Sequence, residues 1–138
     1  MVKTTVRQVN SGFVQTIWPK IDGMIRKAME HSAGEYNTDQ LKVLLVQGLQ
    51  ILLVADDGEK IHGAATVSFI DYPNDKIAFV TSIGGKMLAN KDIWQQFETW
   101  CRAHGCTKVQ GAAFDAVARL WKRQFGTEIC YYIVEKKL

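Results

Sequence analysis

The stretch that decides the fold lies near the middle of the chain, where residues 51–70 read ILLVADDGEKIHGAATVSFI. Its first part, residues 51–55, is a continuous apolar run, which is typical of a strand covered on both faces. Asp57-Gly58 follows, and this pair supplies the backbone angles that a tight hairpin turn requires. Residues 61–70 return as a second strand. The stretch therefore predicts an antiparallel hairpin within a sheet.

The rest of the chain extends this pattern in both directions. Together with the hairpin, the expected strands are residues 4–9, 51–55, 61–70, 77–83, 107–114 and 129–134. The expected helices begin at the N-caps Asn10-Ser11, Thr38, Asn90 and Asp115. Pro19 lies inside the first helical pattern and predicts a kink or two abutting helices, and Gly34 is expected to end that pattern.

This order of elements predicts one α/β (α+β) domain over residues 1–138. The sheet should be mixed and mostly antiparallel, with helices on both faces, because the middle strands are linked by hairpins and the later ones through helices. Five aromatic side chains fall on single helical stripes and are predicted to be largely buried: Trp94, Phe97, Trp100, Trp121 and Phe125.

Composition narrows the class of protein. The chain is 47% hydrophobic and 22% charged, as in ordinary globular domains. A net charge of +3 is too small to indicate nucleic-acid binding. No apolar run is long enough to cross a bilayer, and the N-terminus lacks the apolar core of a signal peptide. We therefore expect a cytoplasmic protein without membrane or nucleic-acid partners.

The three cysteines are expected to be reduced. Cys101 and His104 share a helix face, with Cys106 nearby, but no fourth ligand and no Cys-x-x-Cys motif accompany them. We expect no metal site. Cys130 falls in an apolar run and is interpreted as a core thiol.

Residues 115–127 read DAVARLWKRQFGT. They resemble a C-terminal motif of the GNAT superfamily of N-acetyltransferases, Asn-x-x-Ala-x-x-Leu-Tyr-x-x-Leu-Gly-Phe, with Ala118 and Gly126 in register. The hairpin around Gly58 is similar to another segment of that family, and the resemblance covers nearly the whole chain. It implies a GNAT-like fold, acetyl-CoA as cofactor, and a small-molecule or protein amine as acceptor.

Two positions carried over from this resemblance are candidate catalytic residues. Lys122 stands where the family often has a tyrosine that protonates the departing thiolate, and Asp115 stands where an asparagine often touches the cofactor arm. Each has a plainer interpretation. Lys122 is interpreted as a solvated charge beside Arg119 and Arg123 in preference to a proton donor, and the simplest role of Asp115 is that of an N-cap.

The resemblance places the pyrophosphate loop between the strand 77–83 and the next helix. The candidate cofactor-binding residues are Ile83, Gly84, Gly85, Lys86, Leu88, Ala89 and Asn90. The glycines do not match the family's positions, and Asp92 in the first helical turn would repel a phosphate, which Lys86 and Lys91 partly offset. A shifted loop at Gly84-Gly85-Lys86 and a simple strand-ending turn both remain open.

A general base is harder to find in the sequence. The strand 77–83 offers only Thr81 and Ser82, while Asp71, Asp75 and His62 lie near hairpin ends and fit turn or surface roles. Two hypotheses follow. The chain is an acetyl-CoA-dependent N-acetyltransferase, or it is a catalytically silent GNAT-fold interaction or structural protein with protein partners. The chain is also similar to GNAT-like proteins of tailed phages, which implies a virion or host-cytoplasm location.

Overall fold

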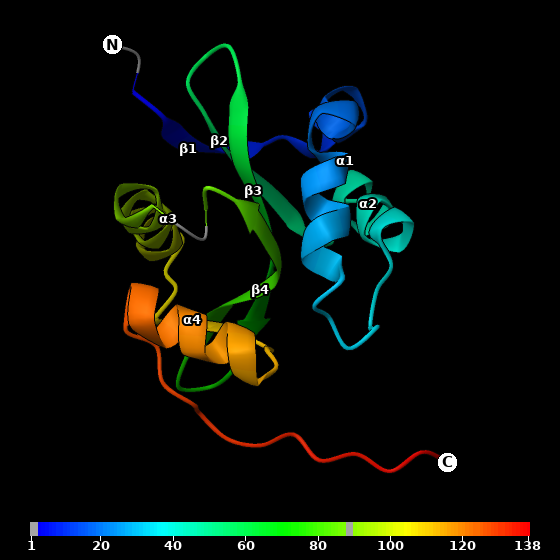
Figure 1. Cartoon of the computed structure of the whole chain (residues 1–138), viewed down its shortest axis with the longest axis vertical. Helices are drawn as coiled ribbons and strands as arrows, with labels where there is room; N and C mark the ends of the chain where they lie inside the picture. Colours follow the sequence, from blue (N-terminus) through cyan, green and yellow to red (C-terminus); the bar gives the residue numbers. More distant parts are fainter. Residues whose placement is uncertain (1–2, 88–89) are drawn as a thin grey trace.

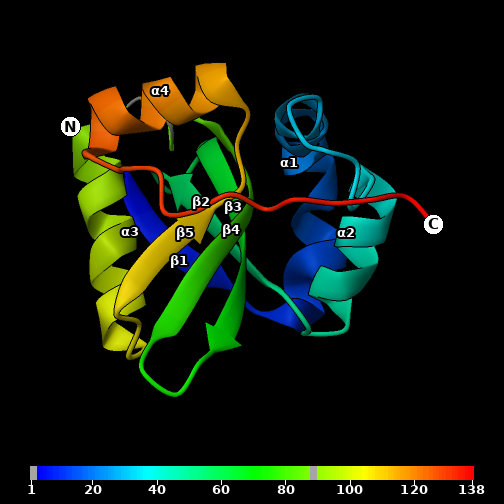
Figure 2. The same ribbon diagram turned by 90° about the horizontal axis from the view of Figure 1, so that it is seen from below.

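A computed structural model describes residues 3–87 and 90–138. The elements run in the order β1 (Thr5–Val9), η1 (Ser11–Phe13), α1 (Val14–Met29), α2 (Thr38–Val46), β2 (Ile51–Asp56), β3 (Ile61–Asp71), β4 (Lys76–Gly85), α3 (Lys91–Ala103), β5 (Lys108–Gly111) and α4 (Asp115–Phe125). The described strands form one sheet in the order β1-β2-β3-β4-β5. Helices α1 and α2 cover one face, and α3 and α4 cover the other (Figures 1 and 2).

The predicted antiparallel meander is confirmed. β2 pairs antiparallel with β3, and β3 pairs antiparallel with β4, while β5 joins β4 in parallel after the α3 crossover. Gly58 takes a φ of +94° at the tip of the first hairpin. Within that hairpin Asp57 accepts hydrogen bonds from the N–H groups of Glu59 and Lys60, and its other carboxylate oxygen lies 2.8 Å from the His62 ring.

A β-bulge interrupts the pairing of β3 with β4. Thr66 is paired with Ser82, but its neighbour Val67 is paired with Val80, so that Thr81 is an extra residue on β4. A bulge of this kind bends its strand and redirects the side chain that it carries. No local pattern in the sequence indicates this irregularity, and it lies where β4 and β5 separate.

Two apolar cores lie on the two faces of the sheet, because successive side chains of a strand point to opposite sides. On β2, Leu53 and Ala55 pack with α3 and α4, whereas Leu52 and Val54 pack with α1 and α2. The apolar run at residues 51–55 is therefore a strand covered on both faces, as predicted.

The aromatic side chains along one side of α3 pack against those of α4 on one face of the sheet. Trp94 stacks on Phe125 with ring centroids 3.9 Å apart and meets the edge of Trp121 at 6.0 Å. Trp94, Phe97 and Trp121 are buried, while Trp100 and Phe125 are half-buried at the edge of the cluster. A Cβ on Gly111 would come within 2.8 Å of the Trp121 indole ring, so this ring packs directly against the Gly111 backbone.

Several predicted helix boundaries were wrong by a few residues. α2 is capped by Asn37, which forms a capping box with Gln40, and not by Thr38. Asp115 is the first residue of α4 and Phe114 is its N-cap. α1 is a single helix that continues through Pro19, and it ends at Met29 rather than at Gly34. Capping depends on local backbone geometry, which several neighbouring polar residues can satisfy equally in sequence.

The predicted last strand is not formed. Residues 127–138 have no regular secondary structure in the described part of the chain, and the strand predicted at residues 107–114 is limited to β5. A strand exists only when a neighbour pairs with it, and residues 129–134 have the composition of a strand without such a neighbour. Among the described helices, none is long and apolar enough to cross a membrane.

Candidate functional site

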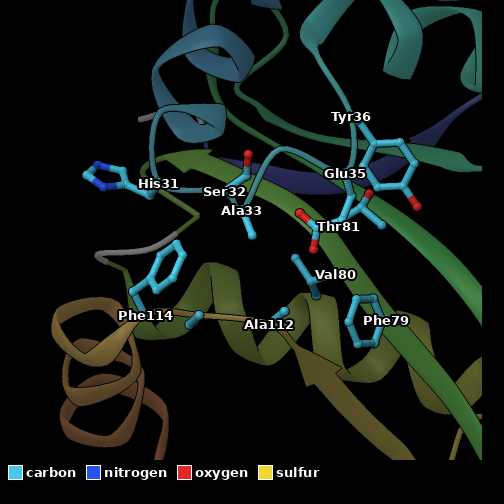
Figure 3. A pocket seen from close by; sticks show the side chains of 11 residues that line it. His31, Ser32, Ala33, Glu35, Tyr36, Phe79, Val80, Thr81, Ala112 and Phe114 are labelled. Atoms are coloured by element: carbon cyan, nitrogen blue, oxygen red, sulfur yellow. The ribbon is translucent and has the colours of Figure 1, made fainter. Parts of the chain in front are cut away.

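A cavity opens where β4 and β5 diverge. The parallel pairing joins residues 77–80 of β4 to residues 108–111 of β5, after which β4 continues to Gly85 while the chain leaves β5 toward α4. The cavity has a volume of about 160 Å³. Its walls are the α1–α2 loop, the bulged part of β4 and residues 112–114 (Figure 3).

Glu35 supplies the charged group of this cavity. Among the described residues that line it, Glu35 carries the one carboxylate, and this points into the cavity toward the bulge at Thr81 (Figure 3). The His31 ring lies at the rim and points outward, and the Tyr36 ring is also turned aside. A carboxylate in this position can attract a cationic group and accept a proton from it.

The bulge residue Thr81 belongs to a chain of buried polar groups. Its hydroxyl donates to Gln50 Oε1 at 2.6 Å and lies 2.7 Å from the Thr66 hydroxyl, which in turn lies 2.6 Å from the Ser82 hydroxyl. Each hydroxyl has one proton to donate, so the bond from Thr81 to Gln50 fixes the direction of the other two hydrogen bonds. Thr66 donates to Thr81, and Ser82 donates to Thr66. Thr66 is fully buried. The network therefore holds the bulge in place behind the cavity wall.

The loop predicted to receive a pyrophosphate starts with two glycines that are needed for packing. A Cβ at Gly84 would come within 3.0 Å of the Met24 carbonyl oxygen in α1. Gly85 has a φ of +63°, and a Cβ there would collide with the His62 carbonyl. These contacts alone account for the glycine pair.

Two amide groups of the described part of this loop form hydrogen bonds within the protein. The Lys86 N–H donates to the His62 carbonyl at 2.8 Å, and the Asn90 N–H donates to the Lys86 carbonyl at 3.2 Å. Asn90 also caps α3 by accepting from the Ile93 N–H, as predicted. Leu88 and Ala89, which were predicted to contact the cofactor, lie outside the described residues.

Charged side chains surround this loop. Lys86 and Lys91 are exposed and can attract a phosphate. Asp92 is exposed in the first turn of α3 and accepts a hydrogen bond from Gln96 at 3.1 Å. Gln96 also bonds the backbone of β1 at Val6. The described part of the loop therefore offers phosphate groups the side-chain charges of Lys86 and Lys91.

The residues predicted to be catalytic do not line the cavity. Lys122 and Asp115 are both exposed on α4, and Phe114 reaches the cavity in place of its neighbour Asp115. Ile83 is buried in the sheet. The structure brings Thr81 to the cavity wall and Ser82 behind it.

The sequence interpretation missed Glu35 and Gln50. Glu35 lies in a polar stretch between two helices that reads as an ordinary loop, and Gln50 lies just before β2. Both matter only because the fold brings the α1–α2 loop and the start of β2 to the β4 bulge. A polar residue directly before an apolar strand, as Gln50 is, was the one local signal available.

The cysteines show no sign of a reactive or metal-binding role. Burial raises the pKa of the Cys101 thiol to about 12, and burial also raises the pKa of Cys106. No group of three or more possible metal ligands occurs among residues 3–87 and 90–138. Cys130 is exposed, so its interpretation as a core thiol was wrong; the segment that carries it has no regular secondary structure.

Comparisons with known proteins agree on the fold. No protein-family model and no curated protein matches the sequence. Three solved structures illustrate the similarity. An aminoglycoside acetyltransferase from an uncultured soil metagenomic sample, in complex with sisomicin, has a TM-score of 0.68 at 13% identity, with 98% of this chain and 96% of that chain covered. A predicted acetyltransferase with acetyl-CoA from Clostridium acetobutylicum has a TM-score of 0.64 at 12% identity, with 97% and 96% covered.

The third is a transcriptional regulator from Bacillus halodurans, with a TM-score of 0.59 at 18% identity and 98% and 99% covered. The chain therefore has the fold of GNAT acetyltransferases, which confirms the predicted fold class. At these identities the similarity shows the fold and nothing finer, since one fold serves many functions.

Proposed function

We propose that this GNAT-fold chain is an acetyl-CoA-dependent N-acetyltransferase whose acceptor is a primary amine. The observation that carries the proposal is the position of the Glu35 carboxylate, in a cavity where β4 and β5 separate and opposite the bulge at Thr81. Solved structures with this fold include an acetyltransferase with acetyl-CoA and an aminoglycoside acetyltransferase with sisomicin.

The chain offers suitable contacts for acetyl-CoA. β5 pairs with β4 only as far as Val80, so the edge of β4 from Thr81 to Gly85 lies outside that ladder and can bond the amide groups of the cofactor arm. Lys86 and Lys91 lie near the end of this edge and would attract the phosphates. Engagement of the Lys86 and Asn90 amides within the loop predicts modest affinity, because fewer backbone donors face the diphosphate.

Glu35 would prepare the acceptor. A primary amine is mostly an ammonium ion at neutral pH and cannot attack a carbonyl carbon in that form. The Glu35 carboxylate draws the ammonium into the cavity and accepts one proton from it, which frees the nitrogen lone pair. Bound acetyl-CoA would supply a thioester. The neutral amine would form an N–C bond with the carbonyl carbon of that thioester as its C–S bond breaks.

The nitrogen loses a second proton when the amide forms, so the ammonium gives up two protons in all. The departing thiolate takes up one proton, and the reaction as a whole therefore releases one. The resemblance names Lys122 as the donor to the thiolate. Its position outside the cavity wall makes water the simpler donor in this protein.

The shape of the cavity suggests the kind of amine. A volume of about 160 Å³ accommodates an aminomethyl group or the end of a lysine side chain rather than a whole multi-ring molecule. Aromatic side chains at Phe79 and Phe114 line it, and aromatic faces favour a cation. The remainder of the acceptor, whether a small molecule or a protein, would stay outside the cavity.

Isothermal titration with acetyl-CoA, followed by thiol release with a panel of primary amines, tests the proposal. Glu35→Gln should lower kcat/KM by about 10²- to 10⁴-fold and leave the affinity for acetyl-CoA unchanged. Glu59→Gln, an exposed change in the β2–β3 turn and outside the residues that line the cavity, serves as the matched control. Equal activity of the Glu35→Gln variant and the control would exclude Glu35 as the base.

One observation favours a second function, a catalytically silent GNAT-fold protein that acts through protein partners, in the cytoplasm or as a component of a phage particle. The glycine pair is accounted for by packing, and the Lys86 and Asn90 amides are engaged in internal hydrogen bonds. This function predicts no saturable heat with millimolar acetyl-CoA, which distinguishes it from the first.

A further inference from the structure

A side chain from α3 occupies the outer edge of β1. β1 is the first strand of the sheet, and among the described strands only β2 pairs with it, so its other edge faces away from the sheet. Helix α3 runs close to that edge (Figures 1 and 2). There the Val6 N–H donates to Gln96 Oε1 at 2.8 Å, and Gln96 Nε2 donates to the Thr4 carbonyl oxygen at 3.1 Å.

The two backbone groups that Gln96 contacts are those that a neighbouring strand would use. Successive residues of a strand direct their N–H and C=O groups to opposite edges. The groups of Thr4 and Val6 therefore share the outer edge, while those of Thr5 face β2. An added strand would accept from the Val6 N–H and donate to the Thr4 carbonyl. The primary amide of Gln96 carries the same acceptor and the same donor, and it takes the place of that strand.

Asp92 fixes the orientation of this amide. Gln96 Nε2 also donates to Asp92 Oδ2 at 3.1 Å, one helical turn earlier in α3. The NH₂ group has two protons, and the Asp92 carboxylate and the Thr4 carbonyl each accept one. If the amide were turned over, its oxygen would face two acceptors and its NH₂ group would face the Val6 N–H. Asp92 therefore favours the orientation that fits β1.

The β1 strand has few other means of avoiding contact with a foreign strand. An open edge is a template for pairing with another chain, and proteins commonly protect it with proline or with unpaired charges such as lysine. β1 reads TVRQV and contains neither proline nor lysine. Its one charged residue, Arg7, is ion-paired with Asp56 of β2 at 2.6 Å. The edge therefore depends on a group from outside the strand.

We propose that the Gln96 amide, oriented by Asp92, is an edge stop that prevents strands of other chains from pairing with β1. Asp92 is then a positioning residue, which gives an acid a role beside a loop where a phosphate would disfavour it. The proposal does not depend on catalysis or on acetyl-CoA.

Amide hydrogen exchange, followed by NMR, tests the bond to β1. Gln96→Met keeps an unbranched side chain of similar length but removes the amide. The Val6 N–H should then exchange about tenfold faster, because it loses its acceptor. The Arg7 N–H, which faces β2, is the internal reference and should change less than about twofold. Equal acceleration at Val6 and Arg7, or none at Val6, would overturn the proposal.

Gln95→Met is the matched control, since it makes the same change at an exposed position one residue earlier in α3. It should leave both exchange rates as they are in the native chain. Sedimentation of the native chain and the two variants over a wide range of concentrations then tests the edge itself. Gln96→Met should form larger species at concentrations where the other two do not. Identical sedimentation of all three would overturn the edge stop, even if Val6 exchanges faster.

Asp92→Ala tests the orienting role. Exchange at Val6 should rise, but by less than in Gln96→Met, because the Gln96 amide still reaches β1 in part of the molecules. When Gln96→Met is already present, Asp92→Ala should have no further effect on Val6, since the two residues act through one bond. Unchanged exchange in Asp92→Ala, or additive effects in the double variant, would overturn the role given to Asp92.

Discussion

Replacing Thr66 by valine removes the central hydroxyl of the network behind the cavity. Thr66→Val keeps the shape of the side chain, so that it opens no cavity, but it takes one partner from Thr81 and the hydrogen-bond acceptor from Ser82. Thr81 keeps its bond to Gln50, whereas Ser82, only 7% exposed, has little access to water. A buried polar group left without a partner costs about 1–3 kcal/mol, and we expect destabilisation in this range.

Urea unfolding followed by circular dichroism measures the change as a shift in midpoint at constant slope. Thr5→Val, the same substitution at an exposed position of β1, is the control and should stay within about 0.5 kcal/mol. A second variant tests the reason for the effect. If the cost arises from the orphaned Ser82 hydroxyl, Thr66→Val combined with Ser82→Ala should be less destabilised than Thr66→Val alone.

The reasoning is refuted if Thr66→Val is as stable as the native chain, or if the double variant loses the sum of both single effects. In the active protein the same substitution should also lower the rate of acetyl transfer, because Thr81 forms part of the cavity wall. Retention of full activity despite a measured loss of stability would show that the network serves folding alone.

Three further predictions concern other parts of the molecule. Trp121→Ala should cost about 3–5 kcal/mol in urea unfolding, since the ring packs against Trp94 in the core, and a loss below about 1 kcal/mol would contradict this packing. Asp92→Asn should strengthen acetyl-CoA binding in calorimetry, and binding should weaken with added salt; an unchanged affinity would argue against this loop as the phosphate site. The hydrogen bond from His62, with the loop amides, holds the pKa of Asp57 well below its usual value. Its contribution to stability is therefore present above about pH 4 and lost as the pH falls further, so Asp57→Asn should flatten the acid side of a stability-against-pH curve.

The prediction from sequence was strongest where local pattern and tertiary packing agree. Asp57-Gly58 between two apolar runs predicted the β2–β3 hairpin, and Asn90 was correctly identified as the cap of α3. It was weaker at Thr38, because the adjacent polar residue Asn37 takes the capping role, and at Asp115, where the backbone places the apolar Phe114 at the N-cap without a side-chain hydrogen bond. It failed at residues 129–134, where the composition of a strand was present and a pairing partner was not.

The candidate site could be predicted only in part. The strand 77–83 drew attention to Thr81 and Ser82, but no local pattern marks Thr81 as a bulge residue or links it to Gln50, which lies 31 positions earlier. Glu35 had no signal of its own. A loop carboxylate becomes a candidate base only when the fold places it beside a strand that is distant in sequence.

The sequence by itself determined the order of helices and strands from β1 to α4, the two-faced burial of β2 and the apolar character of the tail, because each follows from the spacing of side chains along one segment. The tertiary structure alone decided where β4 and β5 separate, which carboxylate faces the cavity, and that the tail is unpaired. Those features depend on contacts between segments far apart in the chain, and such contacts are formed by packing of the whole sheet rather than by local preference.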